Sequence, residues 1–157
     1  MEFSELIAMK KSKKVPSEGE IFVLQPLPNQ FYYGKVIQTN INSRDSFING
    51  MTLIYIYNKV SQDRHVPQNL DNEELLIAPI IVNNQPWQKG YFETIGNINV
   101  SENEKKINYG FWDLFKEKFV DIKGDILENE PQYWTQYGLG SYGIVGKELQ
   151  KAIKNSY

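Results

Sequence analysis

The chain has 157 residues, a formal net charge of −2 and no cysteine. This length fits one domain that can bury a sizeable core without a disulfide or a metal to hold it together. The lack of cysteine excludes disulfides, cysteine nucleophiles and thiolate-bound metals. A net charge so close to zero creates no global field that would attract nucleic acid or a membrane surface.

The first residues argue against export. The N-terminal segment Met1–Glu5 is acidic, and the apolar run at residues 6–9 is too short for the core of a signal peptide. No apolar run approaches the length that a membrane span requires. We therefore expect a cytoplasmic protein with no membrane partner.

Residues 1–14 are predicted to form a short basic arm, with one or two helical turns over residues 3–11, ahead of a domain at residues 15–157. Four of the five residues at positions 10–14 are lysines. A solvated connector is the favoured interpretation, because four charges supply little salt-dependent affinity for nucleic acid.

The next part of the chain predicts strands. Residues 20–25 and 31–38 are β-prone and flank a loop with two prolines, which indicates a hairpin. In residues 51–57, Met51, Leu53, Tyr55 and Tyr57 alternate with a second apolar set. Gly34 in mid-strand suggests a bulge or a close backbone crossing. We expect an α+β fold with a mainly antiparallel, strongly bent, barrel-like sheet.

The middle of the chain is less regular. Residues 70–77 suggest a short helix or turn that Pro79 prevents from continuing, followed by a short strand at residues 80–82. Residues 86–96 predict a turn, a strand and a second turn, with Gly90 and Gly96 at the two ends of the strand. Because this stretch is rich in aromatic residues, we expect it to be central and to build the core.

Towards the C-terminus, aromatic strands are predicted at residues 109–115 and 119–122. The one clear helix follows, because apolar residues recur there at helical spacing: Ile144, Val145, Leu149, Ala152 and Ile153. Lysines in its last turns suit the helix dipole.

No motif supports an enzyme. Residues 138–143 match the pattern G-x-G-x-x-G, but the chain ends too soon for the strand and the acidic residue that a dinucleotide site needs. We therefore expect turn positions there and no cofactor. His65 is the only histidine, so a metal site and a serine–histidine triad are both disfavoured.

The charge distribution points to a binding surface. Residues 63–130 hold 13 acidic and seven basic residues. An acidic rim is predicted from Asp71, Glu73, Glu74, Glu128 and Glu130. Trp134 and Tyr137 lie in a polar, glycine-rich context and are candidate anchors for a partner protein.

Several blocks resemble the immunity protein 26 family: residues 19–22 with 26–28, residues 33–37, and Pro86-Trp87 followed by Gly90-Tyr91-Phe92-Glu93-Thr94-Ile95-Gly96. The resemblance runs from about Val15 to the terminal helix. The family consists of bacterial immunity proteins encoded beside polymorphic or contact-dependent toxins. It implies an α+β fold that binds and neutralises a cognate toxin, and it transfers no catalytic residue.

Two functions from different classes follow. In the first, the protein covers the active site of a toxin, for example a cationic nuclease that an acidic surface would steer towards it. In the second, a small nucleic-acid-binding barrel would use Lys10–Lys14 as an arm and its aromatic residues for base stacking. We favour the first, and we expect nucleic acid not to be the partner. An uncharacterised enzyme is a distant third possibility.

Overall fold

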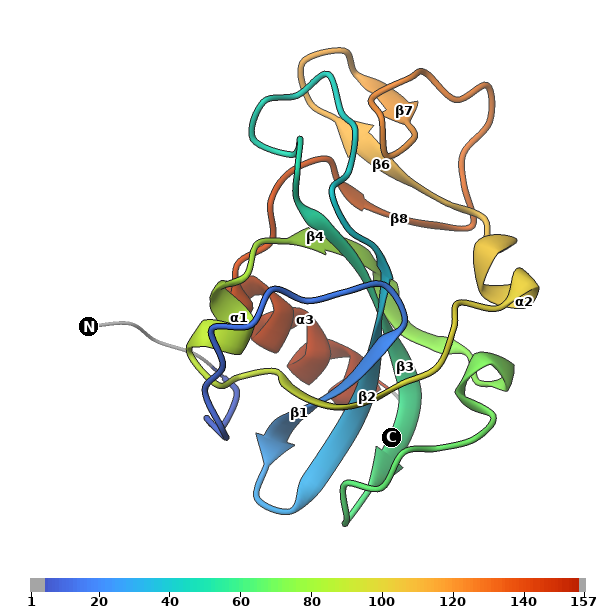
Figure 1. The fold of residues 1–157 in the computed structure, drawn as a ribbon. Coiled ribbons are helices and arrows are strands. Elements are labelled where there is room, and N and C mark those ends of the chain that lie inside the picture. The colour runs from blue at the N-terminus through green and yellow to red at the C-terminus, as the bar shows by residue number, and fades with distance from the viewer. Residues whose placement is uncertain (1–4, 156–157) are drawn as a thin grey trace.

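The computed structural model describes residues 5–155, which form two β-sheets and a C-terminal helix (Figure 1). The larger sheet is antiparallel, with the strand order β4-β3-β2-β1-β5, and the smaller one has the order β7-β6-β8. The larger sheet contains β1 (Glu20–Leu27), β2 (Gln30–Gln38), β3 (Thr52–Ser61), β4 (Leu75–Val82) and β5 (Glu93–Asn97). The smaller sheet contains β6 (Tyr109–Asp113), β7 (Lys118–Val120) and β8 (Tyr133–Gln136).

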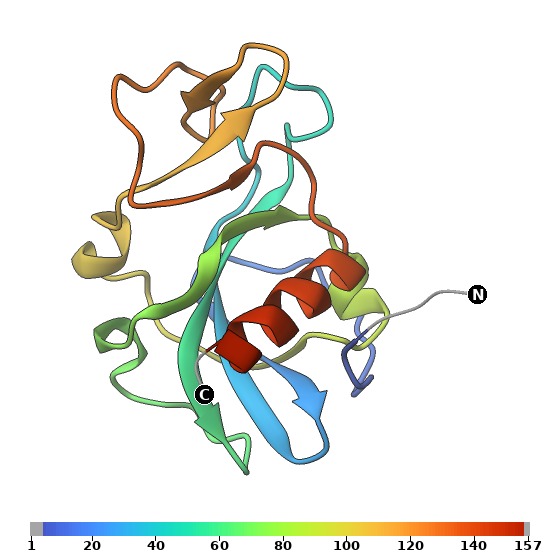
Figure 2. The ribbon, with the colours of Figure 1, turned by 180° about the vertical axis from the view of Figure 1, so that it is seen from behind.

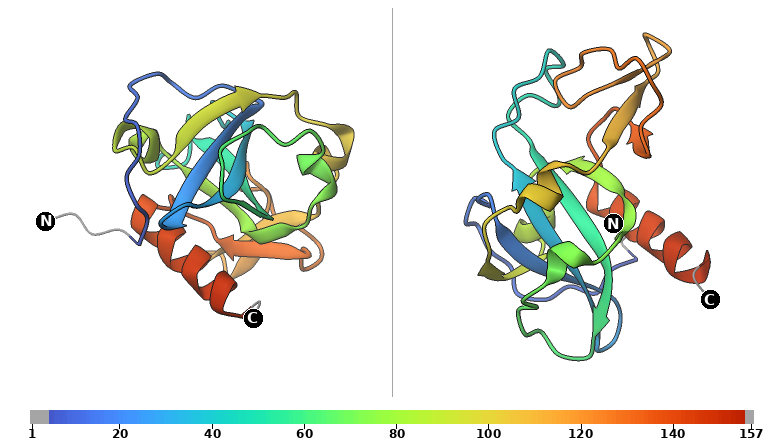
Figure 3. Two further views of the ribbon diagram at one scale, coloured as in Figure 1. Left: turned by 90° about the horizontal axis from the view of Figure 1, so that it is seen from below. Right: turned by 90° about the vertical axis from the view of Figure 1, so that its right-hand side faces the viewer.

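Short helical turns lie in the connections. They are the 3-10 helix η1 (Leu70–Asn72) and the single-turn helices α1 (Gln85–Gln88) and α2 (Glu102–Lys105), and the long helix α3 (Tyr142–Asn155) ends the described chain. The predicted α+β class with mainly antiparallel strands is confirmed. The sheet is strongly curved but stays open, so the fold is bent without closing into a barrel (Figure 3).

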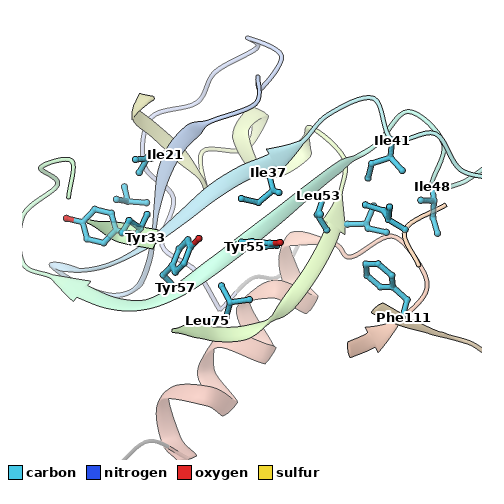
Figure 4. Close-up of a cluster of buried hydrophobic side chains, with 14 of the residues drawn as sticks. Ile21, Tyr33, Ile37, Ile41, Ile48, Leu53, Tyr55, Tyr57, Leu75 and Phe111 are labelled. Atoms are coloured by element: carbon cyan, nitrogen blue, oxygen red, sulfur yellow. The ribbon is translucent and has the colours of Figure 1, made fainter. Parts of the chain in front are cut away.

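The larger sheet is buried on both faces, because alternate side chains of its central strands enter two different cores. Ile21, Tyr33 and Tyr55 belong to the core on one face, which also holds Phe111 of the smaller sheet (Figure 4). Phe22, Val36 and Ile54 belong to the other core. The alternation predicted for residues 51–57 is therefore confirmed.

Helix α3 covers the second face (Figure 2). Its apolar stripe buries Val145, Leu149 and Ile153, as the helical spacing predicts. Beside it, the ring of Phe22 stacks on Phe92 at 4.5 Å and meets Trp87 edge-on at 5.3 Å. The prediction that the stretch around Trp87 builds the core is confirmed, although β5 is an edge strand and not a central one.

Gly34 is needed for this packing. A Cβ atom at this position would lie 2.3 Å from the tip of the Phe22 ring. The register between β2 and β3 also shifts between Tyr32 and Gly34. The bulge and the close approach that the sequence suggested both occur, and the intruding group is a ring from the neighbouring strand.

Three local predictions differ from the structure. The first hairpin turns over residues 28–29 only, because β1 continues through Pro26 at an irregularity in the ladder. Residues 75–82 form the edge strand β4, which tolerates Pro79 because one side of an edge strand needs no donor. No helical turn occurs in residues 5–11; the rest of that predicted segment lies outside the described residues.

Candidate functional site: the surface around strand β8

Strand β8 presents an aromatic residue to the solvent. Tyr133 packs against the core and Thr135 is half-buried, whereas Trp134 and Gln136 are exposed. The Trp134 side chain is 44% exposed, which is high for so large an apolar group. Its ring forms one end of an edge-to-face aromatic row across the smaller sheet, 5.2 Å from Phe119, which in turn lies 4.9 Å from Trp112.

A groove runs between β8 and helix α3, above the outer edge of β4. It has two adjoining compartments of about 570 and 430 Å³. Trp134, Ile80 and Glu148 line both. The apolar residues that line at least one compartment are Leu75, Leu76, Ile77, Ala78, Leu139, Ile144 and Ala152. The groove is therefore mostly apolar, with an aromatic wall and carboxylates at its border.

One carboxylate is hydrogen-bonded to Trp134, and a second lines the same groove. The indole Nε1 donates a hydrogen bond of 3.1 Å to Oε1 of Glu130, so the side chain has a defined orientation. Glu148 on α3 is 46% exposed and lies 3.7 Å from the amine of Lys151 in an exposed ion pair. Such surface pairs contribute little stability, so Glu148 is free to exchange Lys151 for another cation.

The predicted acidic rim is divided by β8. Asp71, Glu73 and Glu74 line a second hollow of about 280 Å³, together with Lys106 and Tyr133. The Glu73 carboxylate lies 3.9 Å from the amine of Lys59. Glu130 is beside Trp134, and Glu128 is exposed in the loop before β8. The structure thus places four of these carboxylates beside β8 in two groups, and it shows no contact between Glu128 and the other four.

Tyr137 has a different environment from Trp134. Its hydroxyl donates to the Ile122 carbonyl oxygen at 2.8 Å and lies 2.6 Å from Oγ of Ser43. Its half-buried ring packs on Phe111 at 5.5 Å. Burial raises the pKa of this phenol, and the Ser43 hydrogen bond opposes the increase. These contacts join the 39–51 loop to the smaller sheet. The role of Tyr137 as an anchor for a partner stays a prediction.

A buried polar cluster was not predicted from the sequence. The carboxylate of Glu104 accepts hydrogen bonds from Lys35, from the Tyr57 hydroxyl and from the backbone N–H of Ser101. Burial and this carboxylate raise the pKa of Tyr57, and burial raises that of Tyr55. The cluster stabilises the 98–108 connection on the sheet. Its sequence signal is the spacing Ser101-x-x-Glu104, a capping box.

The other sequence motifs take structural positions. His65 is exposed, with its imidazole against Asp63. Gly140 lies against Ile80, where a Cβ atom would be 2.6 Å from that side chain, so the glycine-rich stretch lets the chain cross β4 just before α3. A steric reason for glycine therefore exists at Gly140, whereas an added Cβ atom at Gly138 would meet no atom within 4 Å.

The lysines of residues 10–14 do not extend freely from the body. The backbone N–H of Met9 donates to Gly90 O at 2.7 Å, and that of Ser12 donates to Trp87 O at 3.0 Å. Leu6 is buried in the core under α3. The described part of the N-terminal segment is thus packed on the domain, with its lysine side chains exposed.

An exposed aromatic residue in an apolar groove bordered by carboxylates is the arrangement expected of a protein that binds another protein. The comparisons with known proteins agree with that class. The family model for immunity protein 26 matches residues 17–116, and the chain belongs to this family. Neither the curated proteins nor the solved structures give a match.

The matched segment ends earlier than the resemblance suggested. It covers β1 to β6 and stops at residue 116, before β7, β8 and α3. Both Trp134 and the helix that carries Glu148 are therefore outside the matched part. Among residues 5–155, no helix has the length and apolar character needed to cross a membrane.

Proposed function

We propose that this protein binds a cognate bacterial toxin and neutralises it by covering the toxin's active site. The observation that carries the proposal is membership of the immunity protein 26 family. In this scheme the protein is a stoichiometric inhibitor and performs no chemistry of its own. It acts in the cytoplasm of the producing cell, within a polymorphic or contact-dependent toxin system.

The surface around β8 is the contact region in this proposal. Trp134 supplies an anchor, and Tyr137 is the second predicted anchor. The rim consists of Asp71, Glu73, Glu74, Glu128 and Glu130. Acidic groups around an apolar centre favour a partner with a basic surface, such as a nuclease, and they speed its approach by electrostatic steering.

The test uses the toxin encoded next to this protein's gene. Co-expression should rescue cells from that toxin, and the two purified proteins should form a complex of fixed stoichiometry in size-exclusion chromatography with light scattering. The toxin's activity should fall in proportion to the inhibitor added. A stable complex in which the toxin stays fully active would refute occlusion, and the lack of both complex and rescue would refute the immunity function for that toxin.

A further inference from the structure

We propose that the groove between β8 and α3 receives an arginine side chain of the toxin, which stacks on Trp134 and pairs with Glu148. This inference rests on the proposed function and gives its binding surface a chemical specificity. It assigns a specific role to the aromatic wall and to the carboxylates beside it. It also names the kind of residue that the partner must present.

The groove combines the features that an arginine needs. Ile80 and Leu139 provide an apolar lining for the methylene stem, and the Trp134 ring provides a face for the guanidinium. Glu148 lines both compartments and provides a carboxylate for the charged end. A purely apolar plug would desolvate the Glu148–Lys151 pair and offer the carboxylate no further hydrogen bond, which is unfavourable.

The contacts around Trp134 leave its ring suited to a cation. Its N–H already donates to Glu130, so the partner does not need to supply an acceptor. An indole that donates to a carboxylate is more electron-rich, which strengthens its attraction for a cation. Among the residues that line the groove, Lys151 is the one basic side chain, and it is 72% exposed. The incoming guanidinium can displace it from Glu148 at little cost.

A second copy of this chain is a poor source for that arginine. The sequence contains two arginines, Arg44 and Arg64. Arg44 pairs with Asp125 at 2.9 Å, and Arg64 pairs with Glu93 at 2.6 Å. Arg64 also lies over the ring of Phe31, 5.5 Å from its centroid, whereas Arg44 is 77% exposed, so the oligomeric state is one of the outcomes tested below.

The test measures binding of the full-length protein to a catalytically inactive form of the toxin encoded beside its gene. Trp134→Ala and Glu148→Gln should each raise the Kd by roughly ten- to hundredfold. The double variant should lose less than the sum, because both residues contact one guanidinium. Trp134→Phe should fall between wild type and Trp134→Ala, because phenylalanine keeps an aromatic face.

Two matched controls remove similar groups elsewhere. Phe47→Ala deletes an aromatic side chain that is 79% exposed, and Glu18→Gln neutralises an exposed carboxylate near β1. Both should bind as wild type does. If Trp134→Ala folds poorly in a thermal melt, Glu148→Gln decides the question, because Glu148 is a half-exposed surface residue of α3.

The possible outcomes separate this inference from the function beneath it. If the wild type binds and neutralises the toxin but Trp134→Ala and Glu148→Gln bind equally well, the arginine site is wrong and the immunity function stands. If the wild type neither binds nor protects, the immunity function is wrong and the arginine site is lost with it. A wild-type dimer that Glu148→Gln dissociates would show that a second copy occupies the groove, and it would also overturn the inference.

Discussion

Lys35 and Glu104 form an ion pair inside the protein, with 2.7 Å between Nζ and Oε1 and side-chain exposures of 3% and 1%. Lys35 comes from the middle of β2, and Glu104 comes from α2 in the connection between β5 and β6. Lys35 also donates to the Asn99 carbonyl oxygen at 3.0 Å. The pair therefore holds this connection on the face of the sheet that carries the core of Tyr33 and Tyr55, against which Ile98, Val100 and Ile107 pack.

Removing one member of this pair should strongly destabilise the fold. Glu104→Gln keeps the size of the side chain but leaves the Lys35 ammonium buried without a counter-charge. We expect a loss of about 3–5 kcal/mol in the free energy of unfolding, measured by urea denaturation. Glu102→Gln, on the exposed side of the same helical turn, should change it by less than about 0.5 kcal/mol.

A double variant tests whether an unpaired buried charge is the cause of this destabilisation. Lys35→Met combined with Glu104→Leu removes both charges, so its loss should be smaller than the sum of the two single losses. Additive losses would show that the two residues act independently, in which case the pair is not what holds the connection.

The buried tyrosines predict a loss of stability in alkaline solution. Burial raises the pKa of Tyr109 to about 12, and it also raises those of Tyr55 and Tyr57. Above the ordinary value of 10.0, an unfolded tyrosine loses its proton while the folded one keeps it. The folded state then binds more protons, so this contribution to stability is complete below pH 10 and declines as the pH rises. We expect a slope of about 1.4 kcal/mol per pH unit for each such tyrosine.

The measurement is urea denaturation at several pH values above neutrality, with tyrosinate absorbance followed in parallel. Tyr57→Phe should show a smaller slope than wild type in the alkaline range, because one linked proton is removed. A wild-type stability that stays constant well above pH 10, or a slope that Tyr57→Phe leaves unchanged, would contradict the linkage.

Gly34 should tolerate no side chain while Phe22 is present. The Phe22 ring is held between Phe92 and Trp87 and cannot move away from a new Cβ atom. We expect Gly34→Ala to cost about 1–3 kcal/mol. Gly138→Ala is the matched control, because no atom lies within 4 Å of the added Cβ there. Measured by chemical denaturation, Gly34→Ala combined with Phe22→Leu should lose less than the sum of the single changes, and strict additivity would contradict the steric cause.

The sequence predicted the regular parts of this fold because their patterns have a simple period. The two apolar sets that alternate in β3 enter the two cores, and the apolar stripe of α3 reflects burial of one helix face. Strand β4 was misassigned in its first half, because Pro79 is interpreted as a break unless the strand is known to lie at an edge. Edge position depends on strand order, which residue patterns do not specify.

The groove of the proposed binding surface could be predicted from the sequence only in part, for a related reason. Composition and charge identified Trp134 and the carboxylates around it. The pairing of β8 with β6 and the packing of α3 beside β4 create the groove, and these are contacts between distant segments. Glu148 was therefore missed, because on the helix it is one more solvated charge until the fold sets it beside Trp134.

Tyr137 offers a test that separates a structural role from a contact with the toxin. Tyr137→Phe removes the hydroxyl that joins Ile122 to Ser43, so we expect stability to fall by about 1 kcal/mol. Tyr133→Phe, from β8, removes a hydroxyl outside this pair of hydrogen bonds and is the control for stability only, because Tyr133 lines the hollow of the acidic rim. Denaturation and toxin binding should be measured on the same samples. An unchanged stability together with a weakened Kd would assign the hydroxyl to the interface instead.

The acidic rim should act mainly on the rate at which the toxin arrives. Reversing two charges with Glu73→Lys and Glu74→Lys should lower the association rate by roughly tenfold at about 0.02 M salt, with little effect on dissociation. At about 0.5 M salt, where the Debye length is only a few ångströms, the variant and the wild type should converge. Glu18→Lys, near β1 and away from β8, should leave the association rate close to that of wild type. Stopped-flow or surface plasmon resonance measurements with the inactive toxin decide the matter. A rate that is equally reduced at both salt concentrations would mean that these two carboxylates make direct contacts and do not steer.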